Sequence, residues 1–435
     1  MSSPTSLLQA CVLVMCVAPM VPLALLSGAA IFGRRASENA VAATLRASII
    51  AGFVAAAVAL ADRIAHPSAT SLLSYGQWFS YGEDSFTLDF VADAPALGFA
   101  LLSTGTCGVV AAFSLRYLHR ERGFHRYFVQ FCLFTLGITL VSLAGSIEVL
   151  FAGWELLGLS SVLLVGFFHE RPAPVANALR VFTVYRASDA AMLSAAVLLH
   201  HWAGSGSLPL LFSGVPTAAL GPGRSLAIVL LLMIAVAGKS ALLPFSGWLP
   251  RAMEGPTPSS AVYYGALSIH AGCFLLLRAE PLLVGVWPAR LLAALAGGAT
   301  ALYAALTLRV QTDVKSRLSY AALAQVGIIV VEISLGWTTL AFLHIVAHAS
   351  VRLLQFLSAP NVMHDQHELE DRAGGRVERR VPLTLPSWLY LFALERGFVD
   401  VLLDRMLVRP FFVVTRWLDR LDRRLVGAPD EGGRR

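Results

Sequence analysis

Residues 230–250, LLLMIAVAGKSALLPFSGWLP, place Lys239 in an otherwise uncharged run, with Pro244 five residues later. A proline inside a helix deprives the carbonyl one turn earlier, here near Ser240, of its hydrogen-bond donor and breaks the helix. Helices broken at membrane depth line a wet cavity or a protein interior, and they mark ion sites in transporters. The stretch therefore predicts a broken membrane helix that carries an ionisable group one turn before the break.

The rest of the chain has the composition of a polytopic membrane protein. Of its 435 residues, 57% are hydrophobic and only 14% are charged, which lies outside the range of soluble globular proteins. Runs of about 20 apolar residues, enough to cross a bilayer as a helix, predict eleven spans: 7–32, 43–61, 94–115, 127–145, 147–168, 178–200, 225–244, 259–284, 289–308, 317–335 and 338–359. The first run is longer than a signal core and follows no basic residue, so we expect it to stay in the mature protein.

The segments outside these spans divide the chain into four expected parts. Residues 1–92 hold two spans and an external loop, and the aromatic and threonine residues of that loop, at 71–93, predict a short hairpin. Residues 93–364 form the main membrane domain, and 365–386 form a charged linker. The tail, 387–435, has apolar residues every three or four positions over 387–426, which predicts amphipathic helices lying on the membrane, on a partner or on the chain's own domain.

Arginine-rich loops set the expected orientation. Basic residues gather after spans one, three and nine and in the tail, whereas the loop at 62–93 is acidic. The positive-inside rule then places the N-terminus outside and the C-terminus in the cytoplasm, in a bacterial inner membrane. These loops also account for the net charge of +6, so we expect no nucleic-acid partner.

Neither a metal nor a cofactor is expected. The five cysteines are scattered through apolar spans without metal-ligand spacing, and we interpret them as core residues. His344 and His348 form a His-x-x-x-His pair, but no acidic residue follows in the hydrolase pattern and no third ligand is evident. The sequence also contains no nucleotide fingerprint, haem ligand pair or iron–sulfur cysteine cluster.

Ionisable residues inside the spans are the main functional signal, because such groups are costly in a bilayer and mark functional sites when they have partners. Glu148 and Glu155 lie two turns apart on span five, and Arg186 and Asp189 lie three apart on span six and can pair. The whole set predicts a buried polar axis across six helices: Glu148, Glu155, Arg186, Asp189, Lys239, His270, Glu332, His344, His348 and Arg352.

Lysine is rare in this chain. Only two of the 33 basic residues are lysines, Lys239 and Lys315. Arginine stays protonated in proteins, whereas a buried lysine ammonium can lose its proton. Lys239 is therefore suited to hold and release a proton, while Lys315, at a helix start, has the alternative role of an interface anchor.

Five segments resemble, in order and near spacing, the antiporter-like subunits of respiratory NADH-quinone oxidoreductase, of the L or chain 5 type. They are GWELLGLSSVLLVGFF, YRASDA, GKSALLPFSGWLPRAMEGPTPSSA, QTDVKSRLSYAALAQVG and HIVAHASVRLLQFLSA. The same family includes subunits of Mrp cation/proton antiporters and the membrane subunit of the DAB inorganic-carbon pump. The resemblance covers about residues 85–365 and implies an all-α fold with inverted five-helix repeats.

The resemblance also implies roles for single residues. Glu155 is similar to the glutamate that pairs with a lysine on the broken helix, here Lys239, and a change in their separation would load or unload a proton. Arg186 and Asp189 match the Arg-x-x-Asp of span six. The remaining matches are His344 and His348 of the span-eleven motif and Lys315 of the Asp-x-Lys turn.

Three departures from the family pattern bear on function. Tyr263 and Tyr264 stand where span eight usually has histidine or lysine, so His270, further along, is expected to substitute. Arg352 stands where the span-eleven motif usually ends in lysine, and it cannot release a proton. Spans four to eight resemble one complete five-helix repeat. The repeat that follows them is expected to be truncated, because the charged linker comes almost directly after span eleven.

These features favour a proton-conducting, cation-coupled membrane subunit of a multi-subunit energy-coupling complex. We expect it to be the membrane half of an inorganic-carbon pump, with a peripheral protein on the cytoplasmic side and H⁺ or Na⁺ as the ion. One alternative is a subunit of a respiratory or hydrogenase-linked proton pump, and another is a membrane scaffold with a vestigial ion path. Any redox centre is expected elsewhere in the complex.

Overall fold

The computed structural model describes residues 4–67, 71–81, 84–211, 220–373 and 386–426. Within them, eleven helical segments are long and apolar enough to cross a membrane, which confirms the predicted all-α polytopic class. The spans are α1 (Pro4–Ile31), α2 (Glu38–Ala65), α3 (Ala94–Tyr117), α4 (Phe124–Leu143), α5 (Ile147–Val165), α6 (Pro172–Ala203), α9 (Pro222–Lys239), an eighth from Thr257 to Arg278, α14 (Trp287–Leu308), α15 (Val314–Ser334) and α16 (Thr338–Ala373).

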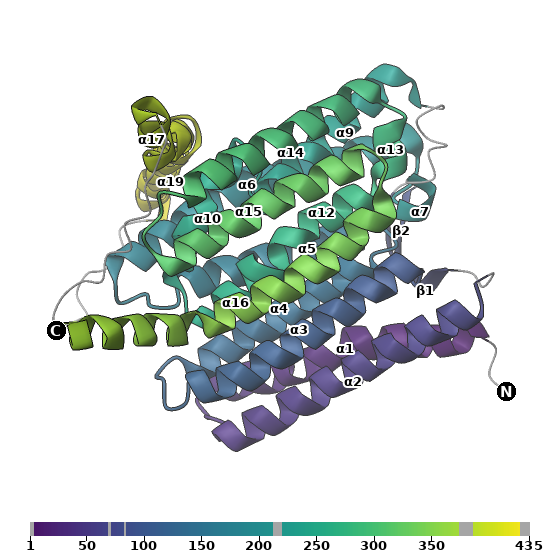
Figure 1. Cartoon of the computed structure of the whole chain (residues 1–435). Coiled ribbons are helices and arrows are strands. Elements are labelled where there is room, and N and C mark those ends of the chain that lie inside the picture. The colour runs from purple at the N-terminus through teal and green to yellow at the C-terminus, as the bar shows by residue number, and fades with distance from the viewer. Residues whose placement is uncertain (1–3, 68–70, 82–83, 212–219, 374–385, 427–435) are drawn as a thin grey trace.

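The helices run side by side as one bundle with two distinct ends (Figure 1). One end carries the hairpin and the short helices α7 (Leu208–Leu211) and α13 (Glu280–Val284). The opposite end carries the tail, built from α17 (Ser387–Leu394), η4 (Arg396–Phe398), α18 (Val399–Leu403), η5 (Asp404–Val408) and α19 (Arg409–Val426). We call these the hairpin end and the tail end.

The predicted hairpin is present. Strands β1 (Leu72–Tyr81) and β2 (Asp84–Val91) pair antiparallel, with Leu73 opposite Phe90 and register shifts on either side of Gln77. Tyr75 donates a hydrogen bond of 2.5 Å to the Gln9 carbonyl of α1. On the other strand, the Asp89 carbonyl accepts from the Gly145 amide at 2.9 Å. The hairpin is thus fixed to the helix ends beside it.

Two matched glycine pairs let neighbouring spans approach closely. A Cβ on Gly153 of α5 would lie 2.8 Å from the Gly137 carbonyl of α4, and a Cβ on Gly327 of α15 would lie 2.5 Å from the Gly297 carbonyl of α14. Small residues at helix crossings bring backbones together in membrane bundles. Spans four and five, and likewise spans nine and ten, therefore approach each other backbone to backbone at these glycines.

The helix break begins earlier than Pro244. Helix α9 ends at Lys239, and Ala241 takes a left-handed φ of 56°, whereas the sequence predicted a span reaching residue 244. Non-helical backbone at membrane depth needs polar partners, and these come from inside the protein. The Trp248 indole N–H donates to the Gly238 carbonyl at 2.9 Å, and the Leu243 amide donates to the Thr300 hydroxyl of α14 at 3.0 Å.

After the break the chain stays inside the bundle as short pieces. These are η1 (Phe245–Gly247), α10 (Trp248–Arg251), η2 (Ala252–Glu254), α11 (Thr257–Ser259), η3 (Ser260–Ala266) and α12 (Ser268–Arg278). The η3 segment is a π-helix, a wide turn that is frequent at functional sites. It carries Tyr263 and Tyr264 and leads directly to His270 on α12.

Helix α16 extends past the expected end of its span at residue 359. It continues to Ala373, and so enters the stretch predicted as a charged linker, whose residues 374–385 lie outside the described residues. The tail then packs on the tail end of the bundle. The Arg251 guanidinium donates to the Asp400 carboxylate at 2.7 Å, and Arg180 pairs with Asp404.

Candidate functional site

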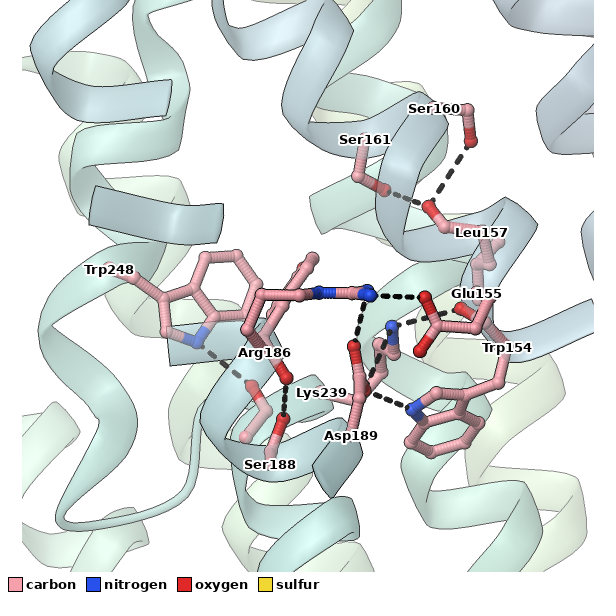
Figure 2. A network of polar contacts seen from close by, with 12 residues as sticks. Trp154, Glu155, Leu157, Ser160, Ser161, Arg186, Ser188, Asp189, Lys239 and Trp248 are labelled. Carbon is pink, nitrogen blue, oxygen red and sulfur yellow. Dashed lines mark hydrogen bonds and ion pairs between the residues drawn. The ribbon is translucent and has the colours of Figure 1, made fainter. Parts of the chain in front are cut away.

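Lys239 is fully buried at the end of α9, between α5 and α6. Its ammonium donates to the Trp154 carbonyl at 3.2 Å and lies 3.9 Å from the Asp189 carboxylate (Figure 2). It also lies 4.4 Å from the ring centre of Tyr185 and 4.9 Å from that of Trp154. Aromatic faces and a helix C-terminus both stabilise a cation, so these groups offset part of the cost of burying the ammonium.

Asp189 connects the charged groups of this cluster. One carboxylate oxygen accepts from the Trp154 indole at 2.7 Å, and the other accepts from Arg186 at 2.7 Å. Arg186 also reaches Glu155 at 2.5 Å. The Arg186 guanidinium therefore bridges the two carboxylates, as Figure 2 shows. We call Glu155, Arg186, Asp189 and Lys239 the lysine cluster.

The pairing expected from the resemblance differs in this structure. Glu155 contacts Arg186, and the carboxylate within 4 Å of Lys239 is that of Asp189. The reason is that Arg186 lies three residues before Asp189 on α6, so one guanidinium can span both acids. Arg186 thus lies between Glu155 and the carboxylate nearest to Lys239.

Glycines make room for this packing. A Cβ on Gly158 would lie 2.9 Å from the Lys239 nitrogen, and a Cβ on Gly238 would overlap the Ser188 side chain of α6. The Gly-Lys pair of α9 and the Gly158 position of α5 therefore bring the lysine against the backbone of α5. Larger residues would push Lys239 away from the Trp154 carbonyl.

A second polar cluster lies on α12 and α16. His270 is fully buried, and its Nε2 lies 2.9 Å from Nδ1 of His348. Arg352 donates from Nε to Nε2 of His348 at 3.0 Å, while Nδ1 of His270 lies 2.6 Å from the Ala266 carbonyl. A carbonyl only accepts and Arg352 only donates. If each ring carries its hydrogen on Nδ1, His270 donates to the Ala266 carbonyl, His348 donates to His270, and Arg352 donates to His348.

His344 extends this second cluster toward the hairpin end. Its Nδ1 lies 3.0 Å from the Glu332 carboxylate of α15, and its Nε2 lies 3.1 Å from the Gln325 side-chain oxygen. The rings of His344 and His348 have centres 6.1 Å apart. We call His270, His344, His348, Glu332 and Arg352 the histidine cluster. The structure thus brings His270 of α12 together with the His344–His348 pair of α16 and gives His344 an acidic partner.

Two buried hydroxyls lie between the clusters. Tyr185 contacts Lys239 with its ring, and its hydroxyl faces that of Ser268 on α12, two residues before His270. Among the described residues, neither oxygen makes a hydrogen bond of acceptable geometry. Buried polar groups without a partner are rare and mark sites for water or for movement. Sequence reasoning missed both residues, since a lone Tyr or Ser in a span carries no distinct signal.

Two predicted site residues lie outside these clusters. Glu148 is at the hairpin end of α5, where it pairs with His200 of α6. Lys315 is in the first turn of α15, next to the helix cap Asp313. It is 17 positions before Glu332 on the same helix, or about 26 Å at 1.5 Å per residue. The structure therefore places Lys315 at the tail end, which fits its alternative role as an interface anchor.

Comparison with known proteins matches this arrangement to a family. The family model described as NADH:quinone oxidoreductase/Mrp antiporter, TM matches residues 144–397, which is more than half of the chain. The chain belongs to this family. A second model, described as the chain 5 N-terminus of NADH-ubiquinone oxidoreductase (complex I), matches residues 78–128. Both clusters lie inside the first match.

Individual relatives of this antiporter family agree with the assignment. The chain is 30% identical over 362 residues to NADH-quinone oxidoreductase subunit L of Neisseria meningitidis, covering 80% of this chain and 52% of the relative. Subunit L of Escherichia coli is 29% identical over 315 residues, covering 72% and 51%. The chain thus spans about half the length of these curated relatives.

Two solved structures share the fold. The Mrp complex from a Dietzia species aligns with a TM-score of 0.64 and 26% identity, covering 88% of this chain and 39% of that one. A membrane-bound sulfane sulfur reductase, described as an archaeal respiratory membrane complex, aligns with a TM-score of 0.70 and 17% identity, covering 90% and 80%. The likeness to the reductase concerns the fold alone.

Proposed function

We propose that the chain is a proton-conducting membrane subunit of a multi-subunit energy-coupling complex, with residues 93–364 as its conducting domain. The observation that carries the proposal is Lys239, a fully buried lysine at the end of a broken helix, held beside Asp189. A buried lysine can exchange its proton when the charges around it move. The arginine bridge between Glu155 and Asp189 supplies the movable charge.

The proposed path runs from the lysine cluster to the histidine cluster. Lys239 passes its proton by way of the neighbouring Tyr185 and Ser268 hydroxyls, and His270 receives it. His270 and His348 are already hydrogen bonded at 2.9 Å, and His344 with Glu332 continues the row toward the hairpin end. Transfer along the row requires the His270 ring to turn, because its Nδ1 donates to the Ala266 carbonyl and its Nε2 accepts from His348. A turned ring can accept on one nitrogen and donate from the other.

The relatives support an assembly rather than a lone transporter. Their names describe subunits of NADH-quinone oxidoreductase and an Mrp complex. We propose a bacterial inner-membrane location with the tail end in the cytoplasm, since the arginine-rich loops lie there. Among the complexes of this family, we propose that the chain belongs to an inorganic-carbon pump, in which a peripheral protein binds on the cytoplasmic side.

The exposed side chains of helix α19 favour binding to a partner protein or to the membrane surface at the tail end. Its exposed apolar residues are Val413, Val414, Trp417, Leu418, Leu421 and Leu425. Arginines alternate with them along the same helix at 416, 420, 423 and 424. A helix with one apolar and one basic face lies at an interface.

Glu155→Gln tests the proton-conducting function. Glutamine keeps the shape and an oxygen that can accept from Arg186, but it removes the charge that draws Arg186 away from Asp189. We expect proton flux to fall at least tenfold while the protein still assembles. The measurement uses proteoliposomes that hold the chain with its co-purifying subunits, a K⁺ diffusion potential and a pH-sensitive dye. Flux at the wild-type rate in well-assembled Glu155→Gln would count against the relay.

A scaffold function is the second candidate, favoured by the contacts of the tail with the bundle. Arg251 with Asp400 and Arg180 with Asp404 join the tail to the bundle beside the helix break. If scaffolding is the function, removal of residues 409–426 should release the co-purifying subunits and leave membrane insertion intact, and Glu155→Gln should change nothing. Pull-down of the complex from detergent extracts measures this loss. Retention of all subunits by the shortened chain would exclude the scaffold.

A further inference from the structure

The hairpin end of the bundle holds a polar cavity that the proposed proton path does not use. Its volume is about 280 Å³, and strand β2, the start of α5, the end of α6 and the loop at 204–207 enclose it. Thr87, Asp89, Ser146, Glu148, His200 and Ser207 provide its polar wall. One water occupies about 30 Å³ in the liquid, so the cavity has room for an ion with several waters.

Backbone hydrogen bonds fix the loop that closes this cavity. The Ile147 amide donates to the Gly206 carbonyl at 2.8 Å, and the Leu208 amide donates to the Gly145 carbonyl at 2.9 Å. Gly206 lies directly against the Glu148–His200 pair, because a Cβ there would come within 2.6 Å of the Glu148 carboxylate. The cavity is thus a built feature of the fold.

Asp89, one of the residues that line this cavity, has a carboxylate oxygen without a partner among the described residues. Its residue is only 8% exposed, and one carboxylate oxygen accepts from the Thr87 hydroxyl at 2.6 Å. The other oxygen is buried and makes no hydrogen bond to any described residue. A buried carboxylate oxygen left in this state is costly unless water, a proton or a cation meets it.

The charges of the wall favour a cation. Glu148 has a basic partner in His200, whereas the Asp89 carboxylate is paired with a hydroxyl, that of Thr87. None of the described residues that line the cavity is lysine or arginine. Carboxylate, hydroxyl and water oxygens are ligands for hard cations. A single acidic side chain without a basic partner among the residues that line the cavity suits a monovalent ion.

We propose that this cavity is a binding site for one monovalent alkali cation, with Asp89 as its charged ligand and waters completing the shell. Water is required because no three His, Cys, Asp or Glu side chains in the described part of the chain are placed to hold one metal ion together. The Ser146 and Ser207 hydroxyls and nearby carbonyls are the remaining oxygens. The inference does not depend on proton transfer at Lys239.

Cation-dependent stability of the full chain with its co-purifying subunits tests this site. The Tm is measured while Na⁺ replaces N-methylglucamine in steps, at constant ionic strength and pH. A ligand that binds only the native state raises Tm in a saturable manner. We expect such a rise for wild type and at least a tenfold higher half-saturating Na⁺ concentration for Asp89→Asn. Glu280→Gln, an acid at the same end that does not line the cavity, should respond like wild type.

Three results would overturn the site. They are equal Tm curves in Na⁺ and N-methylglucamine, an unchanged Na⁺ response in Asp89→Asn, and stabilisation by acid alone, which would assign the cavity to a proton. If Asp89→Asn does not fold, sodium NMR of the wild type decides the question without a variant. Binding broadens the sodium line, and added Li⁺ should reverse the broadening. Because binding is measured without transport, failure here leaves the proposed relay standing, and the reverse also holds.

Discussion

Replacing Lys239 with methionine is expected to reduce proton flux to the level of protein-free liposomes. Methionine fills a similar volume and leaves the broken helix intact, but it has no proton to exchange. Lys239→Arg should fail as well, because arginine keeps its proton and its larger head group has no space beside Gly158. The physical claim is that the site needs a group that can be both charged and neutral. Dye-monitored proton flux under a K⁺ diffusion potential measures both variants.

Lys315→Arg is the matched control for this experiment. It changes the other lysine of the chain, at the start of α15 and away from both clusters. If Lys315 only anchors the helix at the membrane–water interface, arginine can take the same role and proton flux remains at the wild-type rate. Substantial flux in assembled Lys239→Met would instead show that the lysine is structural, and the scaffold function would then be preferred.

Much of the fold follows from the sequence because bilayer thickness fixes span length. All eleven predicted spans are present in the structure, and the hairpin at 71–93 is also where the pattern indicates. The helix break is present as well, but it begins after Lys239 rather than at residue 244. The main misplacement concerns the start of the break. Ala241 adopts a left-handed conformation, and nothing in an alanine marks that conformation in advance.

Which residues contact each other within the site was harder to predict than which residues belong to it. Spacing along a helix places Arg186 beside Asp189, but contacts between helices depend on rotation and vertical offset, which packing decides. The Gly153 and Gly158 positions bring α5 close to its neighbours, and the resulting offset puts Asp189, rather than Glu155, within 4 Å of Lys239. The contact of His270 with His348 has the same origin. Asp89 and His200 had no pattern that distinguished them from ordinary loop and helix-end residues.

Asp189→Ala is expected to produce the largest loss of stability. Asp189 is 3% exposed and accepts from Trp154 and Arg186 while lying near Lys239. Removing one partner from a buried ion pair costs about 3–5 kcal/mol because the remaining charge is left uncompensated. Here the loss falls on Lys239, since Arg186 keeps Glu155. We expect less folded protein in the membrane and a lower Tm, measured in detergent by tryptophan fluorescence.

A double variant separates the charge effect from simple loss of packing. In Asp189→Ala with Lys239→Met no buried ammonium remains, so much of the lost Tm should return, while proton flux stays at background. Asp189→Asn alone should be intermediate, because its amide oxygen still accepts from the Trp154 indole but carries no charge. Equal Tm for Asp189→Ala and the double variant would show that Lys239 and Asp189 are not coupled. The 3.9 Å approach of the two groups would then be incidental, and the relay would require another acid beside the lysine.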